Sequence, residues 1–126
     1  MIIADHNQGW ESKVNFVDEN GVYVGYDLAQ DCCEDTGWFI SKSCDEIYEY
    51  SKSLGLDKPV VDGYNFDINF FKDIESKDLD EGGQVCFRLT HKDKPELFLH
   101  LYNSHNGYYS HGFETNVKGI GEDNYL

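Results

Sequence analysis

The chain has 126 residues, of which 40% are hydrophobic and 15% aromatic, enough for one domain with its own core and too few for two. Its 24 acidic residues against 10 basic ones give a formal net charge of −14. Such a polyanion repels nucleic-acid phosphates and anionic membranes, and no apolar run approaches the roughly 18 residues of a membrane span. We therefore expect a single domain over residues 1–126 that binds neither nucleic acid nor membrane.

The first five residues have neither the basic start nor the long apolar stretch of a signal peptide, so we expect a cytoplasmic protein. Thiols in that compartment stay reduced. We therefore interpret the cysteines as small buried side chains rather than as disulfide partners or metal ligands. They are Cys32, Cys33, Cys44 and Cys86.

A β-hairpin is the first element predicted along the chain. Residues 13–17 and 22–27 are rich in β-branched and aromatic side chains, and Asn20–Gly21 between them is a strong signal for a tight turn. A further short strand is expected at 38–41.

One helix is predicted, over residues 44–54. Ser43 and Glu46 have the spacing of a capping box at its start, and Gly55 stands where a C-cap belongs. Three apolar side chains between these caps recur at helical spacing. They are Ile47, Tyr50 and Leu54.

Strands are predicted for the second half of the chain, with an acidic loop at 75–83 among them. They cover residues 64–74, 84–91, 96–104 and 108–116.

Apolar alternation indicates how the second and third of these strands pair. A slip by one residue would turn one set of apolar side chains to the opposite face, so burial requires both sets to share a side. Leu89 is then opposite Leu97, and Cys86 is opposite His100.

A two-residue turn at Asn106–Gly107 is expected to return the last strand to the one before it, with His111 opposite Tyr102 and Phe113 opposite His100. Together the elements predict an α+β fold. It consists of a mostly antiparallel sheet of about five to seven strands with a C-terminal meander, and the main helix packs on one face.

Two short motifs stand out, QDCCE at residues 30–34 and NGYYS at 106–110, with an aromatic strand at 66–71 between them. In this order they resemble a small uncharacterised domain family found in bacteria and phages. The resemblance covers residues 13–116 and supports the fold. The chain differs in its extra helical segment near 44–54 and in the histidines around the second motif. The family has no settled activity, so no catalytic residue is implied.

The most reactive set of side chains is Cys86, His100 and His111, which could hold zinc or form a thiol nucleophile activated by an imidazole. We favour the alternative that the histidines hydrogen-bond beneath a covering loop. No spacing matches a zinc or hydrolase signature, so we predict no metal, cofactor or catalytic residue. A further alternative is a small-ligand site on the same aromatic face. Its residues would be Phe98, Tyr102, Tyr109 and Phe113.

The surplus negative charge exceeds what solubility needs and is typical of a surface that meets a basic partner. Our hypothesis is a non-enzymatic acidic binding protein that fills the basic cleft of a toxin or nuclease, as bacterial immunity proteins and phage anti-defence proteins do. Aromatic side chains, Tyr26 and Tyr48 among them, would anchor it. The candidate partner-binding residues are Asp31, Glu34, Asp35, Trp38, Asp45, Glu46, Glu49, Asp78, Asp80 and Glu81.

Overall fold

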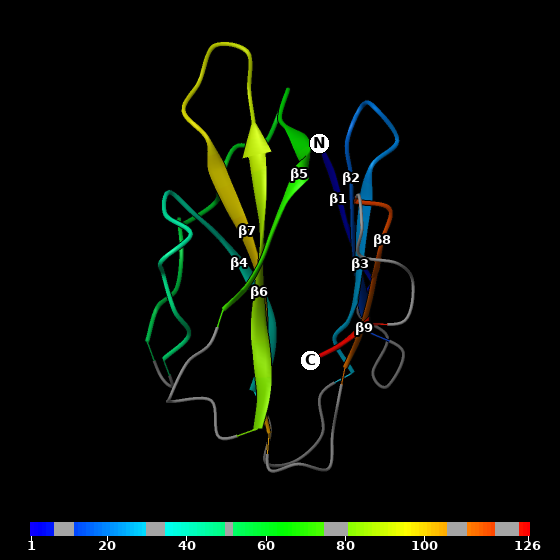
Figure 1. Ribbon diagram of the computed structural model, residues 1–126, viewed down its shortest axis with the longest axis vertical. Coiled ribbons are helices and arrows are strands. Elements are labelled where there is room, and N and C mark those ends of the chain that lie inside the picture. Colours follow the sequence, from blue (N-terminus) through cyan, green and yellow to red (C-terminus); the bar gives the residue numbers. More distant parts are fainter. Residues whose placement is uncertain (7–11, 30–34, 50–51, 75–80, 106–110, 118–123) are drawn as a thin grey trace.

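The computed structural model describes residues 1–6, 12–29, 35–49, 52–74, 81–105, 111–117 and 124–126. These residues form two antiparallel sheets that face each other (Figure 1). In chain order the strands are β1 (Ile2–His6), β2 (Lys13–Val17), β3 (Tyr23–Asp27), β4 (Asp35–Ser41), β5 (Asn65–Ile74), β6 (Glu81–Thr90), β7 (Leu97–His105), β8 (Gly112–Thr115) and β9 (Asn124–Tyr125). One sheet has the order β1-β2-β3-β8-β9 and the other β4-β7-β6-β5.

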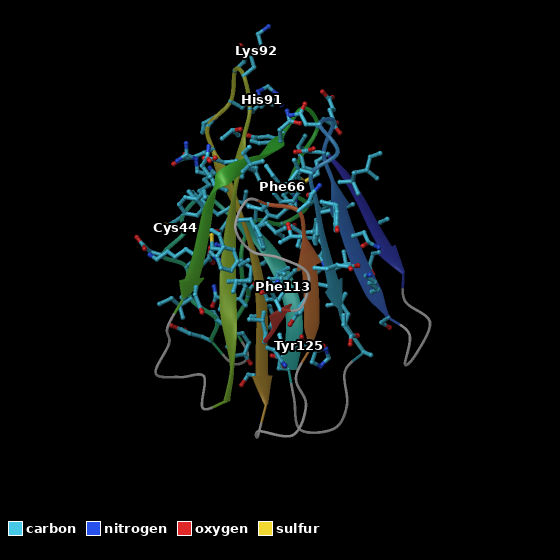
Figure 2. The ribbon with its side chains drawn as sticks, turned by 45° about the vertical axis from the view of Figure 1, so that its right-hand side comes forward. Cys44, Phe66, His91, Lys92, Phe113 and Tyr125 are labelled. Atoms are coloured by element: carbon cyan, nitrogen blue, oxygen red, sulfur yellow. The ribbon has the colours of Figure 1, made fainter. Side chains whose placement is uncertain are left out.

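The described residues contain no helix, so the predicted α+β class is wrong and the observed class is all-β. It follows that none of them forms a helix that could span a membrane. The core lies between the two sheets, where Phe66 and Phe113 point toward each other's sheet (Figure 2). Trp38 of β4 meets Phe16 of β2 there, edge to face, with 5.0 Å between ring centroids.

The first predicted hairpin is confirmed. β2 and β3 pair antiparallel with Val17 opposite Tyr23. Gly21 in the turn between them has a φ of 78°, a left-handed conformation that glycine adopts without a Cβ clash.

The carboxylate of Asp18 ties this turn to the other sheet. Its Oδ1 accepts the N–H groups of Asn20 and Val22, both at 2.9 Å. Its Oδ2 accepts the N–H of Phe66, at the start of β5, also at 2.9 Å. Asp18, a residue that is 6% exposed, thus satisfies backbone donors of the turn after β2 and of β5 in the other sheet.

The predicted register of β6 and β7 is also confirmed, with Leu89 opposite Leu97 and Cys86 opposite His100. Burial of one apolar set on a single face is sufficient to specify this pairing.

The predicted meander is wrong. β7 has no free edge for a returning strand, because β6 lies on one side of it and β4 on the other, from Asp35 opposite Ser104 to Ser41 opposite Phe98. β8 instead pairs with β3 in the other sheet and with the short β9. His111 and Phe113 are therefore not the neighbours of Tyr102 and His100 that the sequence predicted.

The predicted helix over 44–54 is wrong as well; residues 50–51 of it lie outside the described ranges. Its capping groups are used by other partners. The Ser43 hydroxyl accepts the N–H of Asp45, and the Glu46 carboxylate accepts the N–H of Gly55 at 3.0 Å instead of reaching back to Ser43. The side chain of Ile47, which a helix would have buried, is 37% exposed.

Candidate functional site

The segment that replaces the helix is the main feature on the outside of the four-stranded sheet. We call residues 42–49 the covering segment, because they follow β4 and cross the outer face of that sheet (Figure 1). Cys44, within it, lies on this outer side (Figure 2). From Cys44 to Glu49 burial alternates, with residues 44, 46 and 48 turned inward and residues 45, 47 and 49 exposed.

Tyr48 is the principal inward contact of the covering segment. Its ring stacks on that of Tyr102 with 4.7 Å between centroids, and its hydroxyl donates to Oδ2 of Asp35 at 2.7 Å. Burial, followed by the hydrogen bond to Asp35, raises the pKa of Tyr48 well above its ordinary value. Burial also raises the pKa of Tyr102, to about 12, with Asp35 adding to it.

Gln84 of β6 connects the covering segment to the sheet. Its Oε1 accepts the N–H of Tyr48 at 2.8 Å, and its Nε2 donates to the carbonyl of Glu46 at 2.9 Å. The second proton of Nε2 points to Nδ1 of His100 at 3.0 Å. The fully buried amide of Gln84 therefore pairs with two backbone groups of the covering segment and with one side chain of β7.

This network assigns the tautomer of His100. Because Nδ1 accepts from Gln84, the ring proton is on Nε2, which faces Oγ of Ser41 at 2.9 Å and the carbonyl of Ser43 at 3.2 Å. Burial lowers the pKa of His100 to about 4, so the ring is neutral at physiological pH. Phe39 stacks on it at 4.4 Å.

Cys86 lies beside this histidine, as its register predicted. Its Sγ is 3.9 Å from Nε2 of His100, and the residue is fully buried. Burial, with the nearby Cys44 adding to it, raises the pKa of Cys86 to about 12. A protonated thiol next to a neutral imidazole has the opposite protonation pattern from an activated cysteine nucleophile, which needs a lowered thiol pKa.

The other predicted metal ligand lies elsewhere. Nδ1 of His111 is 2.8 Å from the carbonyl of Asp27 in the five-stranded sheet, away from Cys86 and His100. Within the described ranges no three His, Cys, Asp or Glu side chains gather closely enough to hold a metal ion. The aromatic face is divided in the same way. Phe98 and Tyr102 lie on β7, Phe113 belongs to the five-stranded sheet, and Tyr109 is outside the described residues.

The outward side of the covering segment carries an apolar side chain between two carboxylates. The Asp45 side chain is 83% exposed and that of Glu49 is 55% exposed, and Ile47 stands between them. Each carboxylate has one exposed lysine nearby, Lys72 at 3.6 Å from Asp45 and Lys52 at 3.5 Å from Glu49. Ion pairs as exposed as these contribute less than about 1 kcal/mol and exchange readily.

A half-open cavity of about 330 Å³ separates the covering segment from β5. Ile47 and Ile74 supply apolar lining, and the carboxylates of Asp45 and Asp73 lie beside them with Lys72. The arrangement can accept an aliphatic side chain that ends in a cation, because the stem meets apolar atoms and the charged head meets carboxylates.

Of the predicted partner-binding residues, the structure gathers four at the covering segment: Asp45, Glu46 and Glu49 on it, and Asp35 beneath it. Only Asp45 and Glu49 project outward, because Asp35 and Glu46 accept internal hydrogen bonds. Trp38 packs against the inter-sheet core and does not share their surface. The rest lie outside the described residues or, for Glu81, have a backbone position only. They are Asp31, Glu34, Asp78, Asp80 and Glu81.

Two aromatic anchors expected from the sequence are internal, since Tyr26 is fully buried and Tyr48 is 3% exposed. The anchor that the structure offers beside the carboxylates is Ile47. Gln84 was not singled out from the sequence. Its signal was a polar side chain at the start of an alternating strand, on the same face as Cys86 and His100.

A family model described as Domain of unknown function (DUF7448) matches residues 3–115. This confirms the resemblance to an uncharacterised family; the two motifs that suggested it lie at 30–34 and 106–110, outside the described residues. Comparisons with curated proteins and with solved structures found no match.

Proposed function

The chain belongs to the DUF7448 family, whose function is unknown, and we propose that it is a non-enzymatic acidic protein that binds a basic protein through the outward side of the covering segment. The observation that carries this proposal is the row Asp45, Ile47 and Glu49. These three exposed side chains alternate with more buried ones along a non-helical segment, and hydrogen bonds to Gln84 hold the backbone of that segment to the sheet.

Preorganisation makes this row suited to binding. The hydrogen bonds of Gln84 to Tyr48 and Glu46 hold the backbone before any partner arrives, so little conformational entropy is lost on association. Ile47 supplies apolar area and the flanking carboxylates supply charge, which is the usual combination of a small contact centre with a polar rim.

Charge complementarity supports a basic protein as the partner. Within the described ranges, the ion-pair partners of Asp45 and Glu49 are exposed lysines, and a partner's cations can replace these lysines. A net charge of −14 also steers a cationic protein toward the molecule from a distance. We propose a toxin or nuclease as the partner, whose cleft lysines and arginines, otherwise available to phosphate, would pair with Asp45 and Glu49.

The experiment compares two charge-reversed double variants. D45K/E49K changes the covering segment, and D57K/D93K makes the same change in net charge at exposed acids elsewhere. Thermal unfolding first verifies that both variants fold. Proteins captured from the native host at low salt are identified, and the affinity of each purified partner is measured against both variants.

We expect a basic partner whose affinity falls at least tenfold with D45K/E49K and less than about threefold with D57K/D93K. Equal losses in the two variants would show that net charge alone drives the association. Capture of only acidic or neutral proteins would also contradict the proposal.

A further inference from the structure

The edges of the two sheets differ in how they are protected from pairing with another chain. An edge strand exposes unpaired N–H and C=O groups and pairs readily with an added strand, unless it is short, covered, bulged or charged. The edge strands here are β1 and β9 in one sheet and β4 and β5 in the other.

Three of these four edge strands have at least one of these protective features. β9 has two residues. β4 is covered near its end, where the N–H of Leu56 donates to the carbonyl of Ile40 at 2.7 Å. β5 has a register shift between Phe66 and Phe71, and it carries charged side chains along its length.

β1 is neither bulged nor covered in the part of the chain that the structure describes, and its one acid, Asp5, would attract a basic segment. Its five residues pair with β2 in one unbroken register, and it contains neither proline nor lysine. Ile2 is 70% exposed, and Ala4 and Asp5 are exposed too. Among the described residues no strand pairs with its other side, and it forms the free margin of its sheet at the right of Figure 2.

A cavity of about 330 Å³ lies at the start of this edge. Met1, Ile2 and Val17 give it an apolar lining, and the exposed acids Glu19 and Asp62 stand beside them. Asp18 also lines it, but its oxygens already accept backbone N–H groups. The Met1 ammonium is directed to the carbonyl of Val61, at 3.2 Å, so the cavity offers apolar surface to an aliphatic stem and the carboxylates of Glu19 and Asp62 to a cationic head.

We propose that the free edge of β1 takes up an extended segment of a basic protein by strand addition. Main-chain hydrogen bonds to β1 hold the segment. One lysine or arginine of the segment lies over Ile2 and Val17, with its cation between Glu19 and Asp62. This site lies in the five-stranded sheet, and binding there does not depend on the covering segment. A second copy of the chain is a poorer occupant because it would bring another charge of −14 to the same edge.

The probe is a labelled ten-residue peptide of alternating lysine and valine, with an alternating glutamate and valine peptide as its control. Amide hydrogen exchange on the unmodified protein reports the binding mode. The amides of β1 that point away from β2 should exchange at least tenfold more slowly with the lysine peptide and be unaffected by the glutamate peptide.

Two sets of variants locate the site. Ile3→Pro and Ala4→Pro each remove one N–H, and because successive N–H groups of a strand point to opposite sides, one of the two leaves the pairing with β2 intact. The variant that keeps the wild-type unfolding temperature should bind the peptide at least tenfold more weakly. Glu19→Lys should weaken binding about fivefold, whereas Asp57→Lys, in the loop ahead of β5, should change it less than twofold.

Several outcomes would overturn the proposal. Protection of amides elsewhere without protection in β1, equal binding of the acidic peptide, or equal effects of Glu19→Lys and Asp57→Lys would each do so. Formation of a dimer with β1 amides protected would also overturn it, because the occupant would then be a second copy.

Discussion

The outer faces of the two sheets differ in how far they are covered. On the four-stranded sheet, the covering segment buries Ser41, Gln84 and His100, and each of these polar side chains has a hydrogen-bond partner. On the five-stranded sheet, Lys13 and Glu114 form a 2.7 Å ion pair that remains almost half exposed. Polar groups under a cover must be satisfied or they destabilise the fold, whereas polar groups in water contribute little in either direction.

The largest expected effect is at the centre of the covered face. Gln84→Ala leaves the N–H of Tyr48, the carbonyl of Glu46 and Nδ1 of His100 without their partner, so the free energy of unfolding should fall by about 3–4 kcal/mol. Asn15→Ala, on the outer face of the other sheet, should change it by less than about 0.5 kcal/mol. Urea unfolding of both variants measures the difference, and equal effects would contradict the contrast between the faces.

The second effect depends on pH. The pKa of His100 is lowered to about 4 in the folded protein, so the unfolded chain binds a proton first as pH falls. Its contribution to stability is complete above about pH 6.5 and is lost between there and pH 4, by about 3 kcal/mol in total. Urea unfolding of the wild type and of His100→Gln across this range isolates that contribution. Parallel pH profiles would show that His100 does not cause it.

A third contrast uses one glycine from each outer face. A Cβ at Gly37 would lie 2.7 Å from the Tyr102 hydroxyl, whose ring is fixed by its stack with Tyr48, so Gly37→Ala should cost about 2 kcal/mol. At Gly25 a Cβ would meet side-chain atoms of Asn15, Lys13 and Glu114, the nearest being Oδ1 of Asn15 at 2.8 Å, and these partly exposed side chains can move. Gly25→Ala should therefore cost less than about 1 kcal/mol. Thermal unfolding of the two variants provides the test, and a larger loss at Gly25 would reverse the contrast.

The smallest effect concerns the exposed ion pair. A double-mutant cycle with Lys13→Ala and Glu114→Ala should give a coupling energy of about 0.2–1 kcal/mol. Added salt should reduce it, because water and ions reach both groups. A coupling above about 2 kcal/mol that is insensitive to salt would mean that this face is more shielded than its exposure indicates.

The parts of the fold that were predictable are those with a local cause. Asn20–Gly21 specifies the turn between β2 and β3. Alternation of apolar residues specifies the register that places Cys86 beside His100. Both signals act within a few residues or across one hairpin, so they can be recognised from the sequence alone.

The helix was mispredicted because its signals have tertiary partners. Ser43 and Glu46 fit a capping box, yet the N–H of Tyr48 bonds to the side chain of Gln84, which is 36 residues away. No local pattern reveals that a glutamine in a distant strand competes for this backbone. The pairing of β8 was mispredicted for the same kind of reason. The edge of β7 is occupied by β4, which precedes β8 by more than fifty residues.

The candidate site was predictable in composition but not in geometry. Charge pointed to Asp45 and Glu49, and the structure places both on one exposed side. Their common orientation follows from the alternating burial of residues 44–49, which the helical interpretation concealed. Trp38 was selected as an aromatic neighbour of acids, but the same alternation along β4 places it with Ile40 in the core.

The position of Asp18 has a consequence for how the molecule opens. One carboxylate holds the turn after β2 and the first N–H of β5, 48 residues further along the chain. An opening of that turn that displaces the Asp18 side chain also removes the partner of a backbone N–H in the opposite layer. Such an opening therefore exposes amides of both layers in one event, which couples the turn after β2 to the start of β5.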